Sequence, residues 1–509
     1  MATTTDYEAV PAVAGRAAES PLGTVVMKFG GTSVADTVRL KAVAKRIVAA
    51  REQGARVVAV LSAMGDSTDD LVALAYQMSP RPKPRELDML ISVGERISCA
   101  LAAMAIHDLG HEAISLTGSQ AGIVTDTTHG KAKIVDVRAT RIHEALDEGR
   151  IVLVAGFQGV STDLDITTLG RGGSDTTAVA LAVALGAEVC EIYTDVAGVF
   201  TADPRLLTEA RKLHAVSYEE MLELAASGAK VLQLRSVEFA RNHGVKLHVR
   251  SSFSPAEGTW VIEEDERMLE KAMISGVTHT LEETLYWVEN IAAARLFAAL
   301  AVAGVNVDTI VQTGEAEIVF SAPADDADAV SSVLDGLGVM WRLRDDLGKV
   351  SLIGAGMKSH PGVAAKIFAV LDEESIEPKI VTTSPIKVSC HVPRDDVERA
   401  VRALHHAFEL HRPDAERPHV PEWPAARRRR RNGSCRNRHA PAARRTRVRA
   451  RARLCVRSIR GLAGPVRRSR AGSGGRRGAA TAAQSRRKES VESRKNRAPL
   501  FSCGLLSTL

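Results

Sequence analysis

The chain contains few aromatic residues, few cysteines and no long apolar run. Phe, Trp and Tyr make up 4% of the 509 residues, and the 6 cysteines include no C-x-x-C pair of the kind that binds zinc. A disulfide framework lacks support for the same reason, so the composition predicts a protein of the reducing cytoplasm. No stretch of about 18 apolar residues occurs, and we therefore expect no membrane span. Residues 1–22 lack the basic and apolar regions of a signal peptide and are predicted to form a flexible leader.

The charge of the chain is divided between two unlike parts. The segment 411–509 contains 28 of the 67 basic residues and only 5 of the 61 acidic residues. The rest of the chain therefore contains 39 basic and 56 acidic residues. We predict that this Arg-rich tail is disordered, because it has too few apolar residues to form a core. Such a tail suits nucleic-acid binding, but a shifted reading frame in a GC-rich gene produces the same composition. We favour the second interpretation and expect no nucleic-acid partner, because no RNA-binding motif organises the arginines.

The chain also lacks a Walker A loop and any Ser/His/Asp or Cys/His arrangement. It has instead the segment Lys28-Phe-Gly-Gly-Thr-Ser33, which follows an apolar run and precedes a helical pattern. This order predicts a strand, a glycine turn and a helix start. Gly30 and Gly31 allow backbone N–H groups to approach an anion, and the helix dipole and Lys28 add positive potential. These residues alone leave two interpretations open, a phosphate-binding turn and a plain turn with an exposed lysine.

Strand and helix patterns alternate through the first half of the chain. Apolar runs predict strands, and apolar residues at helical spacing predict helices between them. The predicted strands cover residues 25–29, 57–61, 112–116, 151–155 and 189–193, and the clearest helices cover residues 87–107 and 176–185. The fold class is therefore α/β, with a largely parallel sheet between helices. Because ligands collect at the C-terminal ends of such strands, we expect a site formed by Lys28, Ser62, Gly156, Arg171 and Asp195.

The loops at these strand ends carry residues suited to anions. Arg171-Gly-Gly-Ser-Asp175 sets an arginine beside a glycine turn and a helix start, which suits a bidentate grip on a carboxylate. Lys230 adds a second cation after a helix. Glu95 and Arg96 lie inside a predicted helix, where a surface ion pair is the commoner interpretation. Two lysines, an arginine and the glycine turns indicate a site for phosphates and carboxylates.

Residues 274–410 contain an internal repeat with an offset of 71 residues. Residues 292–300 resemble residues 363–371, and each copy continues into two further strands. A strand precedes each helix, so each copy is predicted to contain a strand, a helix and two strands, with one more helix after them. We predict two small α+β modules, residues 274–340 and 341–410, behind a first domain of residues 23–264.

Together these motifs resemble those of aspartate kinases, which belong to the wider amino-acid kinase family. The resemblance extends from about Val25 to about Leu410. The segments that carry it are Lys28–Ser33, Ser62–Gly65, Gly94–Arg96, Gly170–Thr176 and Tyr193–Pro204. The two repeats resemble paired ACT domains, which bind feedback amino acids. The resemblance implies transfer of the ATP γ-phosphate to the side-chain carboxylate of L-aspartate, the first step of lysine, threonine and methionine biosynthesis. Another amino-acid kinase, and a non-catalytic amino-acid sensor with a nucleic-acid-binding tail, are the alternatives.

The resemblance also implies roles for individual residues. Catalysis is assigned to Lys28, Arg171 and Asp195. L-aspartate binding is assigned to Thr68, Asp69, Asp70, Glu95, Arg171, Gly172, Gly173 and Ser174. Within that set, Glu95 faces the ammonium group and Arg171 the α-carboxylate. ATP binding is assigned to Lys28, Phe29, Gly30, Gly31, Ser62, Ser174, Tyr193, Thr194, Asp195, Val199, Phe200, Thr201, Ala202, Asp203, Pro204 and Lys230. No residue is expected to bind a metal directly, because the Mg²⁺ that accompanies ATP is held mainly by phosphate oxygens.

The regulatory half departs from the family pattern. The resemblance implies effector binding, of lysine and/or threonine, by Asn306, Val307, Asp308, Gln312, Pro361, Gly362 and Val363. In the first module the strand that ends near Asn290 runs almost directly into the helix, so about five residues of the effector loop are missing. Thr313, Glu377 and Pro385 also replace residues usual in the family. Our hypothesis is that feedback inhibition is weakened or altered while catalysis is intact. The resemblance further implies a homo-oligomer formed through the ACT modules, and Met268 is placed for an internal start that would produce a separate regulatory subunit.

Overall fold

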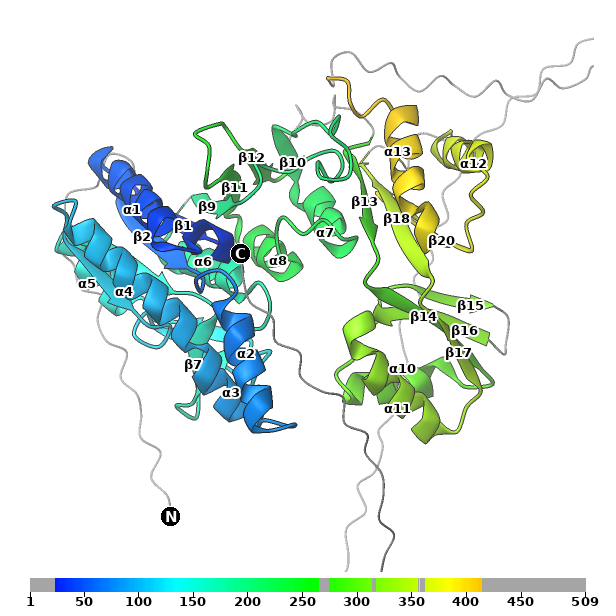
Figure 1. The fold of residues 1–509 in the computed structure, drawn as a ribbon, viewed down its shortest axis with the longest axis horizontal. Coiled ribbons are helices and arrows are strands. Elements are labelled where there is room, and N and C mark those ends of the chain that lie inside the picture. Colours follow the sequence, from blue (N-terminus) through cyan, green and yellow to red (C-terminus); the bar gives the residue numbers. More distant parts are fainter. Residues whose placement is uncertain are drawn as a thin grey trace, which may run out of the picture. The chain divides into compact units, whose positions relative to one another are not determined.

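The computed structural model describes residues 23–187, 189–264, 274–313, 317–355, 357 and 362–413 (Figure 1). Four predictions lie outside the described residues: the leader, the internal start at Met268, the effector role of Pro361 and almost all of the Arg-rich tail. The fold below is therefore that of residues 23–413 with the gaps stated.

An eight-stranded sheet forms the centre of the first domain, with the strand order β10-β12-β11-β9-β1-β2-β6-β3 (Figure 1). Its strands are β1 (Thr24–Phe29), β2 (Arg56–Leu61), β3 (Ala113–Leu116), β6 (Ile151–Ala155), β9 (Val189–Thr194), β10 (Ala215–Ser217), β11 (Lys246–Ser251) and β12 (Thr259–Ile262). The six strands from β11 to β3 in this order run parallel, and β12 is antiparallel to β11. The predicted α/β class with a mainly parallel sheet is confirmed.

Helices cover both faces of this sheet. One apolar layer contains α1 (Thr37–Glu52) and α4 (Val93–His107). The other contains α5 (Thr140–Asp147), α6 (Gly173–Ala184), α7 (Tyr218–Ala226) and α8 (Leu234–His243). Successive side chains of a strand point to opposite faces, and in β1 Val26 joins the layer of α6 while Met27 and Phe29 join the layer of α1. Lys28 therefore points to the face that α6 covers.

The structure contains a second, four-stranded sheet with the order β5-β4-β7-β8, which the sequence did not predict. Its strands are β4 (Ile123–Thr125), β5 (Ile134–Val137), β7 (Gln158–Ser161) and β8 (Ile166–Thr168), each too short to show a clear period. Two further helices, α2 (Ser67–Met78) and α3 (Pro84–Ile91), lie between β2 and α4, and α3 packs against β8. The prediction of one helix over residues 87–107 is wrong, because α3 and α4 meet at Ser92. The helix predicted from Thr176 begins earlier, at Gly173.

Among the described residues, one stretch is long and apolar enough to cross a membrane by composition alone, Pro84–His107. In the structure it consists of α3 and α4, and 50% of its most apolar window is buried. Cys99, Ala102 and Ile106 on α4 pack in the same apolar layer as α1. Packing in the core thus accounts for the apolar character of this stretch.

The second half of the described chain forms two four-stranded antiparallel sheets, one in each module. The first contains β14 (Glu283–Glu289), β15 (Ile310–Thr313), β16 (Glu317–Pro323) and β17 (Trp341–Arg344), with α10 (Ala293–Val302) and α11 (Ala327–Leu337) packed on it. The second contains β13 (Gly276–Thr280), β18 (Leu347–Ile353), β19 (Ile380–Ser384) and β20 (Lys387–Pro393), with α12 (Val363–Glu373) and α13 (Val397–Ala407) packed on it.

The predicted order of strand, helix, two strands and helix is present in both modules, but the split at residue 340 does not follow the sheets. β13 precedes the first module yet pairs with β18 of the second, and β17 follows residue 340 yet pairs with β14 of the first. The first module is therefore inserted into the second. The shortened loop is observed: residues 290–292 join β14 to α10, whereas residues 354–362 join β18 to α12.

Candidate active site

Lys28 lies near the C-terminal end of β1 and pairs with a residue that the sequence analysis did not assign to the site. Its Nζ is 2.6 Å from Oδ1 of Asp175, and the two side chains are only 12% and 8% exposed. Asp175 lies in the first turn of α6, where the positive end of the helix dipole favours a carboxylate. The pair gives Lys28 a fixed direction. The signal in the sequence was the acidic residue at the start of the helix that packs on β1.

The glycine turn after Lys28 packs against the loop after β2. A Cβ atom on Gly30 would lie 3.5 Å from Lys28 Nζ, and one on Gly31 would lie 3.1 Å from the carbonyl oxygen of Ala63. Ser62 N–H donates to the carbonyl of Phe29 at 3.1 Å, and Gly65 N–H donates to the carbonyl of Gly31 at 3.2 Å. The two loops therefore form one continuous surface beside Lys28.

The predicted helix is present as α1, but it does not begin directly after the glycine turn. The glycine turn leads into a short 3-10 turn, η1 (Gly31–Val34), and α1 begins only at Thr37, where the Asp36 side chain accepts a hydrogen bond from Arg39 N–H. The dipole of α1 is thus displaced from the glycine turn. The cation beside the turn is Lys28, whose Nζ would lie 3.5 Å from a Cβ atom on Gly30.

Glu95 is a buried carboxylate in the first turn of α4. It is 3% exposed, and burial raises its pKa to about 7, although the backbone N–H groups of Glu95 and Ala63 and the charge of Arg96 lower it in part. Among the described residues its Oε2 has no hydrogen-bond partner. Arg96 turns away and donates to Gln158 and Ser92, so the surface ion pair considered for Glu95 is not formed.

The loop after β2 connects Glu95 to the glycine turn. A Cβ atom on Gly94 would lie 2.7 Å from the Cβ of Ala63, so α4 touches this loop directly. Ala63 is therefore contacted by Gly31 on one side and by Gly94 on the other. Ser67, at the start of α2, has a buried Oγ that lacks a hydrogen-bond partner within the part of the chain that the structure describes. The sequence analysis missed Ser67 and named its neighbour Thr68.

The other residues assigned to L-aspartate divide into two groups. Asp69 and Asp70 are exposed in the first turn of α2, where acidic residues stabilise the helix start, and Thr68 beside them is half-buried. Arg171 lies in the turn between β8 and α6, exposed and without an ion pair among the described residues. Gly172 follows with a φ of 70°, in the left-handed region that favours glycine.

The first turn of α6 lies at the end of β6. Gly173 and Ser174 are buried there, and a Cβ atom on Gly156 would lie 2.6 Å from Ser174 Oγ. Glycine at position 156 therefore allows this close approach. Of the predicted group at the strand ends, Lys28, Ser62, Gly156 and the Arg171 turn are brought together by β1, β2, β6 and α6. Asp195, the fifth member, directly follows β9, which pairs with β1.

Several residues assigned to ATP have side chains that serve the core. Tyr193 stacks on Phe29 with ring centroids 4.7 Å apart, and its hydroxyl donates to Glu191. Val199 is 1% exposed. Thr201 is fully buried, and its hydroxyl lies 3.0 Å from Nε2 of His405 in α13. The side chain of Ala202, with that of Leu207, packs in the apolar cluster of the second module. These positions can offer a nucleotide only backbone groups.

The other residues that the sequence assigned to ATP binding are mostly polar or charged. Asp195 is exposed and accepts a hydrogen bond from Thr194 Oγ1. Asp203 accepts two hydrogen bonds from the guanidinium and one from the backbone N–H of Arg205, and these lower the pKa of that carboxyl. Lys230 is exposed and pairs with Glu282. Of the remaining members, Phe200 and Pro204 are half-buried. The sequence analysis did not assign Arg205 or Glu282.

The effector residues of the first module include one that is already paired. Asp308 Oδ2 is 2.6 Å from Nζ of Lys349, a lysine that is only 1% exposed and that also pairs with Glu283. Burial alone would raise the pKa of Glu283, but His391 and Lys349 lower it to about 2. Asn306 and Gln312 are exposed, Val307 is half-buried, and Gly362 and Val363 lie at the start of α12, with Val363 buried.

Comparison with known proteins first defines a class. The model of the amino acid kinase family matches residues 23–251, and an ACT domain model matches residues 350–408. The fold and the site thus define an amino acid kinase joined to ACT modules.

Individual relatives narrow this class. Aspartokinase of Mycobacterium tuberculosis is 53% identical over 404 residues, which cover 76% of this chain and 96% of that protein. The crystal structure of E. coli aspartokinase III in complex with aspartate and ADP (R-state) matches with a TM-score of 0.68 and 27% identity, over 76% of this chain and 100% of that one. E. coli aspartokinase III in complex with lysine and aspartate (T-state) matches with a TM-score of 0.60 and 27% identity, over 75% and 99%. The chain belongs to the aspartokinase family.

Proposed function

We propose that the chain is an aspartate kinase, which transfers the γ-phosphoryl group of ATP to the side-chain carboxylate of L-aspartate and forms 4-phospho-L-aspartate and ADP. The observation that carries this proposal is Glu95, a buried carboxylate with an unpartnered oxygen beside the loop that also contacts the glycine turn of Lys28. A group of this kind suits the ammonium of an amino acid held next to a phosphate site. The aspartokinase relatives support the choice of amino acid.

The residue roles follow from charge and exposure. Glu95 accepts hydrogen bonds from the ammonium group of L-aspartate, and Arg171, exposed in its turn, binds the α-carboxylate with its planar fork. Thr68 and Ser67, whose Oγ is buried, offer hydroxyl groups to the same amino acid. Lys28 faces the phosphoryl group during its transfer, and the ion pair with Asp175 orients the ammonium group of Lys28.

The nucleotide side is assigned to two groups of residues. Gly30 and Gly31 allow the phosphates to approach the backbone closely, and Ser62 offers its hydroxyl group, since the backbone N–H groups of Gly30 and Ser62 already donate to carbonyl groups. Thr194, Asp195, Phe200, Asp203 and Lys230 line the nucleotide, with Phe29, Tyr193, Val199, Thr201, Ala202 and Pro204 supporting them through the backbone and the core. In this arrangement Lys230 exchanges its partner Glu282 for a phosphate when ATP binds.

The chemistry needs alignment and charge neutralisation more than proton transfer. The attacking carboxylate has a reference pKa of about 3.9 and is already ionised at neutral pH, so no general base is required. One of its oxygens forms a bond to the γ-phosphorus as the bond between this phosphorus and the bridging oxygen breaks. The electron pair of that bond leaves with ADP. Lys28 neutralises charge on the equatorial oxygens, which is the main demand of phosphoryl transfer.

Magnesium enters with the nucleotide in this proposal. Within the described residues, no group of three or more His, Cys, Asp or Glu side chains is arranged to hold a metal ion. Mg²⁺ bound to ATP is commonly held by phosphate oxygens and water, with few protein ligands. We propose that the ion is carried by the substrate, and we assign no residue of this chain to it.

We further propose that the ACT modules bind lysine and/or threonine and join copies of the chain into a homo-oligomer in the cytoplasm. The structure of E. coli aspartokinase III with lysine supports an amino-acid effector. The short connection at residues 290–292 supports weakened feedback, because three residues offer few backbone N–H groups to an effector carboxylate.

A coupled assay of ADP formation tests the function. With ATP and Mg²⁺, L-aspartate should support steady turnover, and hydroxylamine should trap the acyl phosphate as a hydroxamate. L-glutamate serves as the matched control, since it has the same charges and one more methylene. Equal turnover with both amino acids, or none with L-aspartate, would overturn the proposal.

A further inference from the structure

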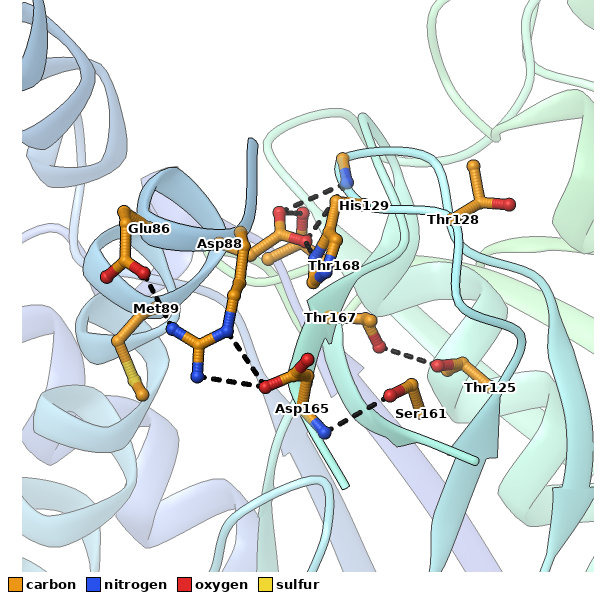
Figure 2. A network of polar contacts seen from close by, with 12 residues as sticks. Glu86, Asp88, Met89, Thr125, Thr128, His129, Ser161, Asp165, Thr167 and Thr168 are labelled. Carbon is orange, nitrogen blue, oxygen red and sulfur yellow. Dashed lines mark hydrogen bonds and ion pairs between the residues drawn. The ribbon is translucent and has the colours of Figure 1, made fainter. Parts of the chain in front are cut away.

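A buried carboxylate, Asp88, contacts the loop between β4 and β5 through His129 and the end of β8 through Thr168 (Figure 2). Asp88 lies on α3 and is 1% exposed. It accepts hydrogen bonds from Thr168 Oγ1 at 2.6 Å, from His129 Nδ1 at 2.7 Å and from Gly130 N–H at 3.1 Å. An ionised carboxylate can only accept hydrogen bonds, and three donors satisfy it. The contact with a carboxylate oxygen assigns the donor role in this pair to His129 Nδ1.

The donors belong to the segments that hold the Arg171 turn. Thr168 ends β8, three positions before Arg171, and its carbonyl accepts a hydrogen bond from Ala132 N–H at 2.9 Å. Arg235 joins the same two segments, because its guanidinium donates to the carbonyls of Leu169 and Ala132. The base of the turn is therefore fixed to the loop between β4 and β5, and Asp88 anchors both.

The helix that carries Asp88 also leads to Glu95. α3 continues through Ser92 directly into α4, whose first turn contains Glu95. This junction is held in place, because Gln158 Nε2 donates to the carbonyl of Ser92 at 2.7 Å. Asp88 thus links the helix pair of Glu95 to the turn of Arg171.

We propose that Asp88, oriented by His129, is a positioning residue that sets the spacing between Glu95 and Arg171 for recognition of the amino-acid substrate. The inference rests on the proposed function, in which these two side chains bind the ammonium and the α-carboxylate of one small molecule. The two charges of that molecule have a fixed separation. A shift of either protein group by about 1 Å therefore weakens binding and alignment.

Thr168 provides a matched pair of variants. Thr168→Val keeps the branched shape and removes the hydroxyl donor, whereas Thr168→Ser keeps the donor and loses only the methyl group. Thr168→Val should raise the KM for L-aspartate about tenfold or more at an unchanged KM for ATP, the scale of one hydrogen bond to a charged group. It should also lower the preference for L-aspartate over β-alanine, which lacks the α-carboxylate. Thr168→Ser should retain the KM of the unmodified enzyme.

Arg85→Gln is the control within the same network. Arg85 pairs with Asp165 at 2.9 Å, so it also joins α3 to the segment of β8, but its side chain is 48% exposed and such pairs contribute little. Its KM values should not change. A KM for L-aspartate within twofold of the unmodified value in Thr168→Val, or equal loss in Thr168→Ser, would overturn the inference. So would equal increases in both KM values, which indicate a general loss of structure.

His129 keeps the inference testable if Thr168→Val does not fold. Its side chain is 20% exposed, so replacement is less disruptive. His129→Asn keeps an N–H donor near the position of Nδ1 and should retain the KM for L-aspartate, while His129→Ala should raise it. Failure of the proposed function is distinguishable, because the unmodified enzyme would then show no turnover with L-aspartate at all.

Discussion

Replacement of Glu95 by glutamine is expected to make the ligand-free protein more stable and the enzyme much weaker toward L-aspartate. Burial raises the pKa of Glu95 from the usual 4.5 to about 7, and the backbone N–H groups of Glu95 and Ala63 and the charge of Arg96 offset only part of this effect. The carboxyl group therefore ionises at a higher pH in the folded protein than in the unfolded chain.

The sign of the stability effect follows from this difference. As the pH rises from 4.5 to about 7, the unfolded chain loses its proton while the folded protein keeps it, so the free energy of unfolding falls. Above about pH 7 the loss is complete and amounts to about 3 kcal/mol, at about 1.4 kcal/mol per pH unit. Glutamine does not ionise. Glu95→Gln should therefore raise the free energy of unfolding by up to about 3 kcal/mol at about pH 8 and by almost nothing at about pH 4.

The effect on activity has the opposite sign. The ammonium group of L-aspartate requires the ionised carboxylate, so kcat/KM for L-aspartate should fall about tenfold for each pH unit below about 7 in the unmodified enzyme. Glu95→Gln should lose this acid limb. Its kcat/KM at about pH 8 should be at least about 30-fold lower, the scale of a buried charge pair that loses one partner.

Urea unfolding at the two pH values and initial rates across the range, at saturating ATP, test both effects. Glu86→Gln is the matched control, because Glu86 is a carboxylate on α3 with a side chain that is 64% exposed. It should change neither stability nor the pH profile. If Glu95→Gln is no more stable than the unmodified protein at about pH 8, or if it keeps the acid limb, the assignment of Glu95 is wrong.

Four further predictions concern catalysis, stability and regulation. Lys28→Ala should leave the fold intact and lower kcat at least about 100-fold in the ADP assay, and near-normal turnover would remove Lys28 from its role. Arg171→Lys should raise the KM for L-aspartate, because a point charge cannot form the fork, and an unchanged KM would reject the assignment. Lys349→Met should lower the free energy of unfolding at neutral pH by about 3–5 kcal/mol, because Glu283 loses its buried partner. Glu283 has a lowered pKa of about 2, so its contribution is present above pH 4.5 and is lost on acidification, and a pH-independent difference in denaturant unfolding would contradict the pairing. Lysine plus threonine should inhibit turnover only weakly, whereas strong inhibition would refute weakened feedback.

Much of the candidate site could be predicted because it depends on local patterns and one geometric rule. The apolar runs of β1, β2 and β6 are evident without any contact information, and parallel strands bring their C-terminal ends to one edge of a sheet. Lys28, Ser62, Gly156 and the Arg171 turn follow from that rule. The repeat in the second half of the chain also predicted two modules from local patterns, because each copy has its own pattern of apolar residues.

Only the tertiary structure decided which side chains meet. Asp175 was visible in its motif, but its pairing with Lys28 depends on how α6 packs against β1. Tyr193 and Asp195 are two positions apart, but β9 ends between them. The side chain of Tyr193 is therefore buried under α1, whereas that of Asp195 is exposed. The exchange of β13 and β17 between the two modules is likewise a choice of hydrogen-bonding partner. These pairings depend on contacts between residues far apart in the chain. The pattern of apolar and polar residues along the sequence does not specify such contacts.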